Sequence, residues 1–329
     1  MTFIHEDNEF NDLIQIVAGQ TRISRALVEK DYWVVHALWA LHQGPFDIWF
    51  KGGTSLSKGF ALIQRFSEDP DLRIVPQESA AGPTVNWTAK KPSPAQLVQR
   101  KDWFRWLAEQ IRVPACAVLI NEDHWRQDLH ARGADIHVRY PGQHLDSLAQ
   151  HNLPYVKLEI GDARVTPFVV RPVSSFVHDH LQGIGMLGNY EANRPEQVRH
   201  VHPWVTLVEK LSIIAKKYGD GRFRAEGFVR HYGDAAQIAI ATLEPPDGYT
   251  LTALVAEMVS GGTVGDLPSA ASAALCLSDE ARRTELESAH ADLAGMYWGP
   301  RQSLADACAV LRAWVAQAEL PGPANRGVR

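Results

Sequence analysis

The sequence predicts an α+β protein in which a small mixed sheet flanked by helices is followed by an α-helical C-terminal domain. Segments that alternate apolar and polar residues, typical of half-buried strands, are confined to the N-terminal part of the chain. Beyond residue 204, apolar residues recur at helical spacing instead. A chain of 329 residues is long enough for two domains. We place them at residues 1–185 and 186–329.

The first elements are a helix, a strand and a second helix. Apolar residues at helical spacing predict an amphipathic helix over residues 25–43. The mostly apolar segment 46–52 then predicts a short strand that ends in a glycine pair. Thr54 or Ser55 is a favourable cap for the helix that follows, which we expect to extend to about Arg65.

The later elements follow the same two patterns. Residues 76–94 are rich in Pro, Ser, Gly and Ala without periodicity, which predicts a mobile loop. The tail from about residue 320 is expected to fray. Alternation predicts strands over 70–75, 134–140 and 155–162, with a further short one within 164–176. Helical spacing predicts helices over 95–112, 204–218, 225–241, 249–260, 279–295 and 301–318.

Composition excludes several classes of protein. The formal net charge of -5 and the pI near 6.3 exclude a basic surface overall, so any contact with nucleic acid requires a local patch. Cys116, Cys276 and Cys308 lie far apart and form neither a disulfide framework nor a zinc motif. The N-terminus has no signal-peptide pattern, and no apolar run reaches the length of about 18 residues that spans a membrane. We therefore expect a cytoplasmic protein that does not contact membranes.

A glycine-containing turn feeds the second predicted helix. Such a turn leaves backbone N–H groups unpaired and directs the positive end of the helix dipole outward, which favours a bound phosphate. A glycine pair is also a common way to end a strand. The phosphate-binding candidates are Gly52, Gly53, Thr54 and Ser55.

Asp69 and Asp71 stand one residue apart at the start of the next predicted strand. Side chains at positions i and i+2 of an extended chain point to the same face, so the two carboxylates converge. Carboxylate pairs bind Mg2+ or Mn2+, which share their remaining ligand positions with the phosphates of a substrate. The turn and the aspartate pair together predict a site for a nucleoside triphosphate (NTP) and its metal, although such a pair is often only a polar strand end.

Glu159 is the candidate for a third metal ligand. It lies on the polar face of the predicted strand 155–162, opposite Val156, Leu158 and Ile160. If this strand neighbours the one that carries Asp71, three carboxylates would hold two ions and support nucleotidyl transfer. A solvated edge residue is the alternative.

The chain resembles the AbiEii/AbiGii type nucleotidyltransferase toxins, bacterial members of the polymerase β nucleotidyltransferase superfamily. The resemblance implies a polymerase β-like nucleotidyltransferase core. It also implies that Glu159 corresponds to the superfamily's variable second carboxylate. The motifs that carry this resemblance occur in the family's order. They are EKDYW at 29–33, FKGGTSLSK at 50–58, RFSEDPDL at 65–72, EKL at 209–211 and RHYGD at 230–234.

The later motifs add residues of the second predicted domain. The resemblance implies that Lys210 and Asp234 are needed for toxicity. We expect Lys210 to meet the triphosphate, and Lys58 and Arg230 to bind the nucleotide as well. Arg230 and Asp234 form an i, i+4 pair, so Asp234 is expected to orient Arg230 or Lys210 or to position the nucleotide. An ordinary interhelical ion pair is the alternative.

A basic concentration surrounds these motifs in the otherwise acidic chain. It offers a path for the backbone of an acceptor RNA, although charge clusters are often merely solvated. The candidate residues are Lys216, Lys217, Arg222 and Arg224.

Three functions are compatible with these features. The first, implied by the resemblance, is the toxin of a toxin–antitoxin or phage-defence system. This metal-dependent enzyme transfers a nucleotide to the 3′ end of tRNA, blocks translation and is checked by a separately encoded antitoxin. The second is nucleotide transfer to a protein hydroxyl, which needs the same carboxylates but not the basic path. The third is a nucleotide-binding module without catalysis.

Overall fold

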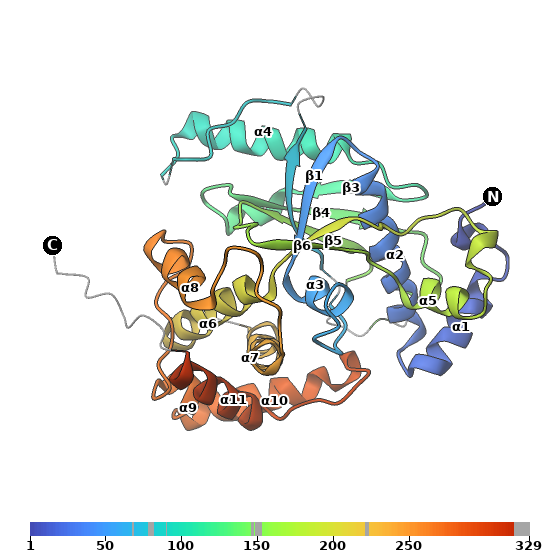
Figure 1. The fold of residues 1–329 in the computed structure, drawn as a ribbon. Coiled ribbons are helices and arrows are strands. Elements are labelled where there is room, and N and C mark those ends of the chain that lie inside the picture. Colours follow the sequence, from blue (N-terminus) through green and yellow to red (C-terminus); the bar gives the residue numbers. More distant parts are fainter. Residues whose placement is uncertain are drawn as a thin grey trace. The chain divides into compact units, whose positions relative to one another are not determined.

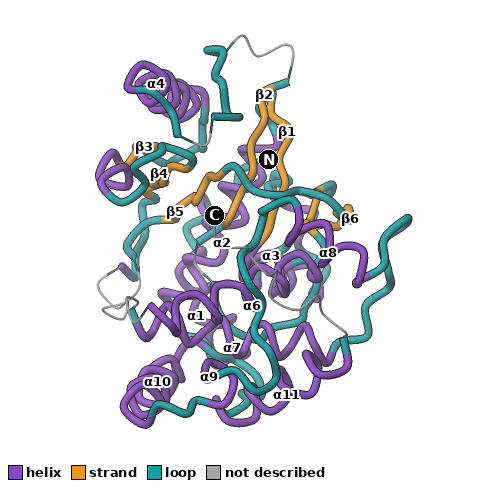
Figure 2. Tube along the Cα trace, turned by 90° about the vertical axis from the view of Figure 1, so that its left-hand side faces the viewer, coloured by secondary structure: helices purple, strands orange, loops and turns teal. Residues whose placement is uncertain are grey.

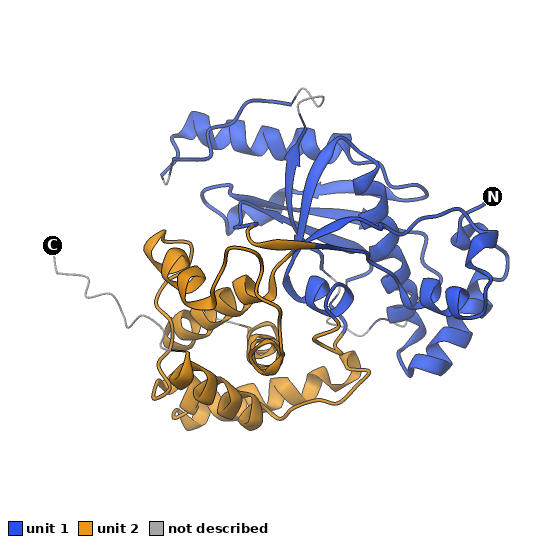
Figure 3. Cartoon of the chain, viewed as in Figure 1, with its two compact units in different colours: residues 1–60, 66–165, 170–200 blue, residues 61–65, 166–169, 201–329 orange. Residues whose placement is uncertain are grey.

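The computed structural model describes residues 1–67, 69–77, 82–89, 91–145, 148, 153–220 and 224–318. The chain divides into two compact units (Figure 3). Unit 1 comprises residues 1–60, 66–165 and 170–200, and unit 2 comprises residues 61–65, 166–169 and 201–329. The expected frayed tail from about residue 320 lies outside the described residues, and our boundary between residues 185 and 186 stays a prediction.

A seven-stranded mixed sheet confirms the α+β prediction (Figure 1). Its order is β3-β4-β5-β2-β1-β7-β6. β1 pairs with β7 and β2 pairs with β5 in parallel, whereas β1–β2, β3–β4 and β4–β5 are antiparallel. The strands are β1 (Phe46–Lys51), β2 (Asp71–Pro76), β3 (Ala117–Asn121), β4 (Gly133–Arg139), β5 (Val156–Gly161), β6 (Phe168–Arg171) and β7 (Val198–Val201).

Alternation gives the sheet of unit 1 one buried and one polar face. In β5, Val156, Leu158 and Ile160 are buried, while the residues between them are half-buried. Helix α2 contacts β1 and β5, and α4 contacts β3 and β4 (Figure 2). The helices of unit 1 are α1 (Phe10–Thr21), α2 (Arg25–His42), α3 (Gly52–Lys58), α4 (Pro94–Gln110) and α5 (Phe176–Gly183).

Helix α3 is shorter than expected. It begins at Gly52, ahead of the predicted cap at Thr54 or Ser55, and it ends at Lys58 rather than near Arg65. The N–H of Gly59 closes the last turn by donating to Ser55 O at 2.8 Å. Ala61 then takes a left-handed conformation with φ 52°, which a continuing helix does not allow.

Unit 2 is helical along most of its length, as the periodicity after residue 204 predicted. Helix α7 packs against α6, α10 and α11. Among the described residues, no helix combines the length and the apolar character that crossing a membrane requires. The helices are α6 (Pro203–Asp220), α7 (Ala225–Ile240), α8 (Leu251–Ser260), α9 (Ala273–Cys276), α10 (Glu280–Asp292) and α11 (Leu304–Gln317).

Candidate active site

The carboxylates predicted from the sequence lie on neighbouring strands. β2 and β5 are parallel, and their register places Asp71 directly opposite Glu159. Directly opposite residues in a sheet present their side chains to the same face. The N–H of Glu159 donates to Pro70 O at 2.9 Å, which extends this pairing back toward Asp69. The structure thus meets the condition of adjacent strands on which the assignment of Glu159 depended.

Lys157 places a positive charge among these carboxylates. Its Nζ lies 3.2 Å from Asp69 Oδ2 and also forms an ion pair with Glu159. Burial alone would lower the pKa of Lys157, but the carboxylates of Asp69 and Glu159 raise it above its ordinary value. The lysine is therefore held as a cation, and the pair of acids is neutralised in part by the chain itself.

Asp135 is a fourth carboxylate that the sequence interpretation missed. The antiparallel register of β4 and β5 sets it directly opposite Glu159, so it shares the polar face. His124 Nδ1 lies 3.2 Å from Asp135 Oδ2, and this hydrogen bond raises the pKa of His124. Burial opposes ionisation of Asp135, but His124 and Lys157 keep its pKa below the ordinary value. Alternation in 134–140 placed Asp135 on a polar face, yet only the register reveals its neighbour.

Gly52 provides the space that Asp71 occupies. A Cβ on Gly52 would lie 1.7 Å from Asp71 Oδ2 and 2.6 Å from Asp71 Cγ. Gly52 also has φ 71°, a left-handed conformation that favours glycine. The glycine turn therefore lies directly against one carboxylate of the predicted metal-binding pair.

The side chains of the turn are bound within unit 1. Thr54 Oγ1 lies 3.0 Å from the backbone oxygens of both Ser67 and Asp69, and holds the segment before β2 against the turn. Ser55 Oγ and His200 Nδ1 share a buried hydrogen bond of 2.9 Å. Burial lowers the pKa of His200 to about 4, so its imidazole is neutral at pH 7.

Lys58 ends α3 with a buried ion pair. Its Nζ lies 2.5 Å from Asp31 Oδ1 and 4.2 Å from the ring centroid of Phe176. These contacts anchor α3 to α2 and α5. The predicted contacts of Lys58 and of the Gly53, Thr54 and Ser55 side of the turn with a nucleotide stay predictions.

A cavity of about 450 Å³ opens over the polar face of the sheet. Its size suits a small-molecule ligand. Acidic and basic groups line it together, so it would accept an anionic substrate only where a cation balances the carboxylates. The charged residues among those that line it are Lys51, Asp71, His124, Asp135, Lys157 and Glu159.

The donor set fits a hard divalent cation in its chemistry. Carboxylate oxygens are the ligands that Mg2+ and Mn2+ prefer, and the bound ammonium of Lys157 shows that this cluster holds a cation. In the described part of the chain, however, no three His, Cys, Asp or Glu side chains are spaced as a metal site. Lys157 Nζ forms ion pairs with both Asp69 and Glu159.

Unit 2 contains a separate buried charge cluster. Asp234 Oδ2 lies 2.9 Å from both Lys210 Nζ and Arg65 Nη2. Burial opposes ionisation of Asp234, but Arg65 and then Lys210 depress its pKa well below the ordinary value. Burial, then Lys210, lowers the pKa of the adjacent His231. The Lys210–Asp234 contact is an ion pair between α6 and α7, which is what the alternative interpretation expected. An orienting role for Asp234 and nucleotide contacts of Lys210 and Arg230 stay predictions.

Sequence interpretation missed Arg65, which we had placed at the end of a helix. Arg65 is the first residue of the RFSEDPDL motif, and its place in that motif was the signal that could have identified it. Of the predicted RNA-binding residues, Lys216, Lys217 and Arg224 are exposed, while Arg222 lies outside the described residues. Whether the exposed three bind RNA stays a prediction.

The chain is similar to a known protein family. The family model described as nucleotidyl transferase AbiEii toxin, type IV toxin–antitoxin system, matches residues 38–305 of the chain. The matched segment includes the glycine turn, the carboxylates of β2, β4 and β5, and the buried cluster of unit 2. Comparison with curated proteins found no match.

Proposed function

The chain belongs to the AbiEii family of nucleotidyl transferase toxins, of type IV toxin–antitoxin systems, and we propose that it transfers a nucleoside monophosphate from an NTP to the 3′ end of tRNA. The observation that carries this proposal is the register that sets Asp71 opposite Glu159, with Asp69 bound to the same lysine. Modification of the acceptor end would block translation. A separately encoded antitoxin would hold the toxin in check.

In the proposed reaction, a hydroxyl oxygen of the acceptor forms a bond to the α-phosphorus of the NTP. The bond from that phosphorus to the bridging oxygen breaks, and pyrophosphate leaves with the electron pair. The hydroxyl proton passes to a carboxylate of the site or to water. Asp69, Asp71 and Glu159 would hold Mg2+ or Mn2+, which when bound supplies charge neutralisation and activates the acceptor hydroxyl. The chain holds the acids in register, and Gly52 leaves the room that Asp71 requires.

The experiment combines the purified protein, Mg2+, each of the four labelled NTPs, and either tRNA or total protein. We expect label on tRNA with release of pyrophosphate. Label on protein instead would favour transfer to a protein hydroxyl. Binding without any transfer would favour the non-catalytic module.

Asp71→Asn tests the assignment of the site in the same assay. We expect transfer to slow by about a hundredfold or more, because loss of one ligand charge removes several kcal/mol of transition-state stabilisation. Asp47→Asn is the matched control, since Asp47 is a carboxylate on the adjacent β1 that pairs with Arg199 instead. Wild-type turnover in Asp71→Asn would show that the carboxylates of β2 are not the catalytic ones.

A further inference from the structure

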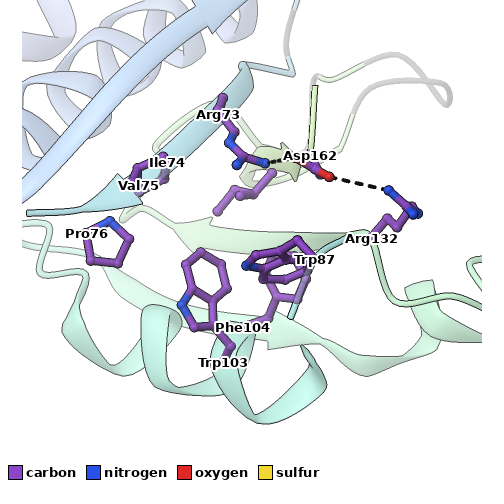
Figure 4. Close-up of a pocket in the computed structure, with 11 residues that line it drawn as sticks. Arg73, Ile74, Val75, Pro76, Trp87, Trp103, Phe104, Arg132 and Asp162 are labelled. Atoms are coloured by element: carbon purple, nitrogen blue, oxygen red, sulfur yellow. Dashed lines mark hydrogen bonds and ion pairs between the residues drawn. The ribbon is translucent and has the colours of Figure 1, made fainter. Parts of the chain in front are cut away.

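A second, smaller pocket of about 150 Å³ lies at the ends of β2 and β5 (Figure 4). Its apolar walls include Trp87, Trp103 and Phe104, which face Ile74 of β2 and Ile160 of β5. The rings of Trp87 and Trp103 meet edge to face, with centroids 5.3 Å apart. An apolar cavity of about this volume holds one aromatic ring, as the benzene-binding cavity engineered into another protein shows.

Charged groups lie at the rim of the aromatic walls. Asp162 forms an ion pair with Arg73, and its other oxygen lies 3.4 Å from Arg132 Nη1 (Figure 4). The pocket thus combines flat apolar surfaces with guanidinium donors and a carboxylate acceptor. This combination suits a planar heterocycle that has polar atoms on its edge.

Two arginines hold the segment that carries Trp87. The buried Arg100 donates from Nη2 to Asn86 O at 3.1 Å and to Ala89 O at 3.0 Å. Arg132 Nη2 donates to the same Ala89 oxygen at 3.2 Å. The segment is irregular, so these bonds, rather than a helix or strand, fix the indole in place. A ligand ring would therefore meet a preformed wall.

The aromatic pocket adjoins the carboxylate cavity. Ile160 and Gly161 line both. Arg73 stands two residues beyond Asp71 on the same strand face, a separation of about 7 Å at the usual rise of a strand. Ile74 and Ile160 belong to the buried face of the sheet, whereas Asp71 and Glu159 lie on the polar face, so a nucleotide that reaches both cavities would pass the end of β5 at Gly161.

We infer that the pocket of Trp87, Trp103 and Phe104 binds a nucleobase by stacking. The inference rests on the proposed nucleotidyl transfer, because both substrates of that reaction bring a base next to the carboxylates. The base belongs either to the NTP or to the terminal residue of the acceptor RNA. The chemistry is shared, and the test separates the two sources.

Equilibrium binding tests the inference without any transfer. Calorimetry compares each NTP with tripolyphosphate, which has no base, in the presence of Mg2+. A second arm compares a short single-stranded RNA with the same RNA carrying an abasic 3′-terminal residue. In the wild type, the base tightens binding in one arm. Trp87→Ala should weaken the binding of that base-bearing ligand by about 5- to 150-fold, the range found when one stacking ring is removed. The Kd of its base-free analogue should stay unchanged.

Two further variants guard against a general effect. Trp87→Leu keeps an apolar side chain but loses the flat ring, so it should behave like Trp87→Ala. Trp314→Ala removes a half-buried indole of α11 that does not line the pocket, and it should bind like the wild type. Circular dichroism checks that each variant folds.

The outcomes are separable. Loss confined to the NTP arm assigns the base to the NTP, and loss confined to the RNA arm assigns it to the acceptor. If the base gives no advantage in the wild type, or the same advantage in both Trp87 variants, the inference is wrong. If base binding depends on Trp87 but no label is transferred to any acceptor, the proposed function fails while the base pocket stands.

Discussion

Gly52 connects the motif in the sequence with the geometry of the site. The side chain of Asp71 occupies the space where a Cβ would lie, and the backbone of Gly52 is left-handed. Each observation alone favours glycine. Together they tie the turn to the carboxylate that the sequence analysis assigned to metal.

Gly52→Ala should therefore damage both stability and turnover. The left-handed backbone costs an alanine about 1–2 kcal/mol, and the Asp71 side chain must move away from the register position. We expect a lower free energy of unfolding in denaturant titrations and a loss of nucleotide transfer. Gly19→Ala in α1 is the control, because a Cβ there meets nothing within 4 Å. Full activity in Gly52→Ala would show that the position of Asp71 is not needed for transfer.

Lys157 should compete with a divalent cation for Asp69 and Glu159. Lys157→Met removes the ammonium, so we expect Mn2+ to bind about tenfold more tightly in the absence of nucleotide, an effect of about 1.4 kcal/mol. Electron paramagnetic resonance of free Mn2+ measures this. Lys91→Met, which removes an exposed ammonium, should bind as the wild type does. Weaker Mn2+ binding in Lys157→Met would mean that the lysine supports the metal instead of competing with it.

At the scale of elements, local sequence patterns predicted where most strands and helices of the core begin and end. The strands β1, β2, β4 and β5 follow the alternation of their residues, and α6 and α7 lie within about two residues of the predicted bounds. The predictions left out α1, α5, α9, β3 and β7. β3 is short and lies at the sheet edge with little burial, and β7 has only four residues, so neither shows a clear periodicity.

Local sequence patterns do not predict which elements pair with one another, or in which register. The sequence marked Asp71 and Glu159 separately, and only the parallel register of β2 and β5 makes them neighbours. Asp135 and Arg65 went unrecognised for the same reason. The register of β4 and β5 sets Asp135 opposite Glu159, and the packing of unit 2 sets Arg65 against Asp234; neither contact follows from spacing in the sequence.

Asp234 should be the most sensitive position of the α6–α7 pair. Asp234→Asn leaves Arg65 and Lys210 buried without their counter-charge, which costs about 3–5 kcal/mol. The folded state depresses the pKa of Asp234, so the carboxylate contributes its stability above the ordinary value near 3.8 and loses it as the pH falls further. Urea titrations at pH 7 and 5 should show the full difference from the wild type, and a titration at pH 3 should show a smaller one.

Asp220→Asn, at the exposed end of α6, is the control for this comparison. It removes the same charge from the same helix without uncovering a buried cation. We expect less than about 0.5 kcal/mol of change. Equal losses in the two variants would mean that net charge, rather than the buried cluster, stabilises unit 2.

On the scale of the whole molecule, charge has to be local to act on RNA. The chain carries a formal net charge of -5, which repels a polyanion at long range. Lys216, Lys217 and Arg224 are exposed near the end of α6 and the start of α7. Composition indicated that a local patch is needed, and these three residues stay the predicted one. The bound orientation of an RNA depends on three-dimensional placement that neither spacing nor composition contains.

Replacing Lys216, Lys217 and Arg224 together by alanine should weaken binding of tRNA and flatten its salt dependence. Each lost phosphate contact lowers the slope of log K against log salt by about 0.7 for a single strand, so three contacts predict a change of about 2. Filter binding from 50 to 200 mM salt measures the slope. Calorimetry with NTP in the same variant should give an unchanged Kd, because the patch is proposed to hold only the acceptor.

The control for this patch is a second triple variant with the same change in net charge. Arg25, Arg112 and Arg126 are exposed residues of unit 1, and their replacement by alanine should leave the slope near the wild-type value. Equal flattening in both triples would mean that RNA responds to total charge alone. A loss of NTP binding with tRNA binding retained would show that the patch serves the nucleotide and not the acceptor, since phosphate contacts follow the ligand that they neutralise.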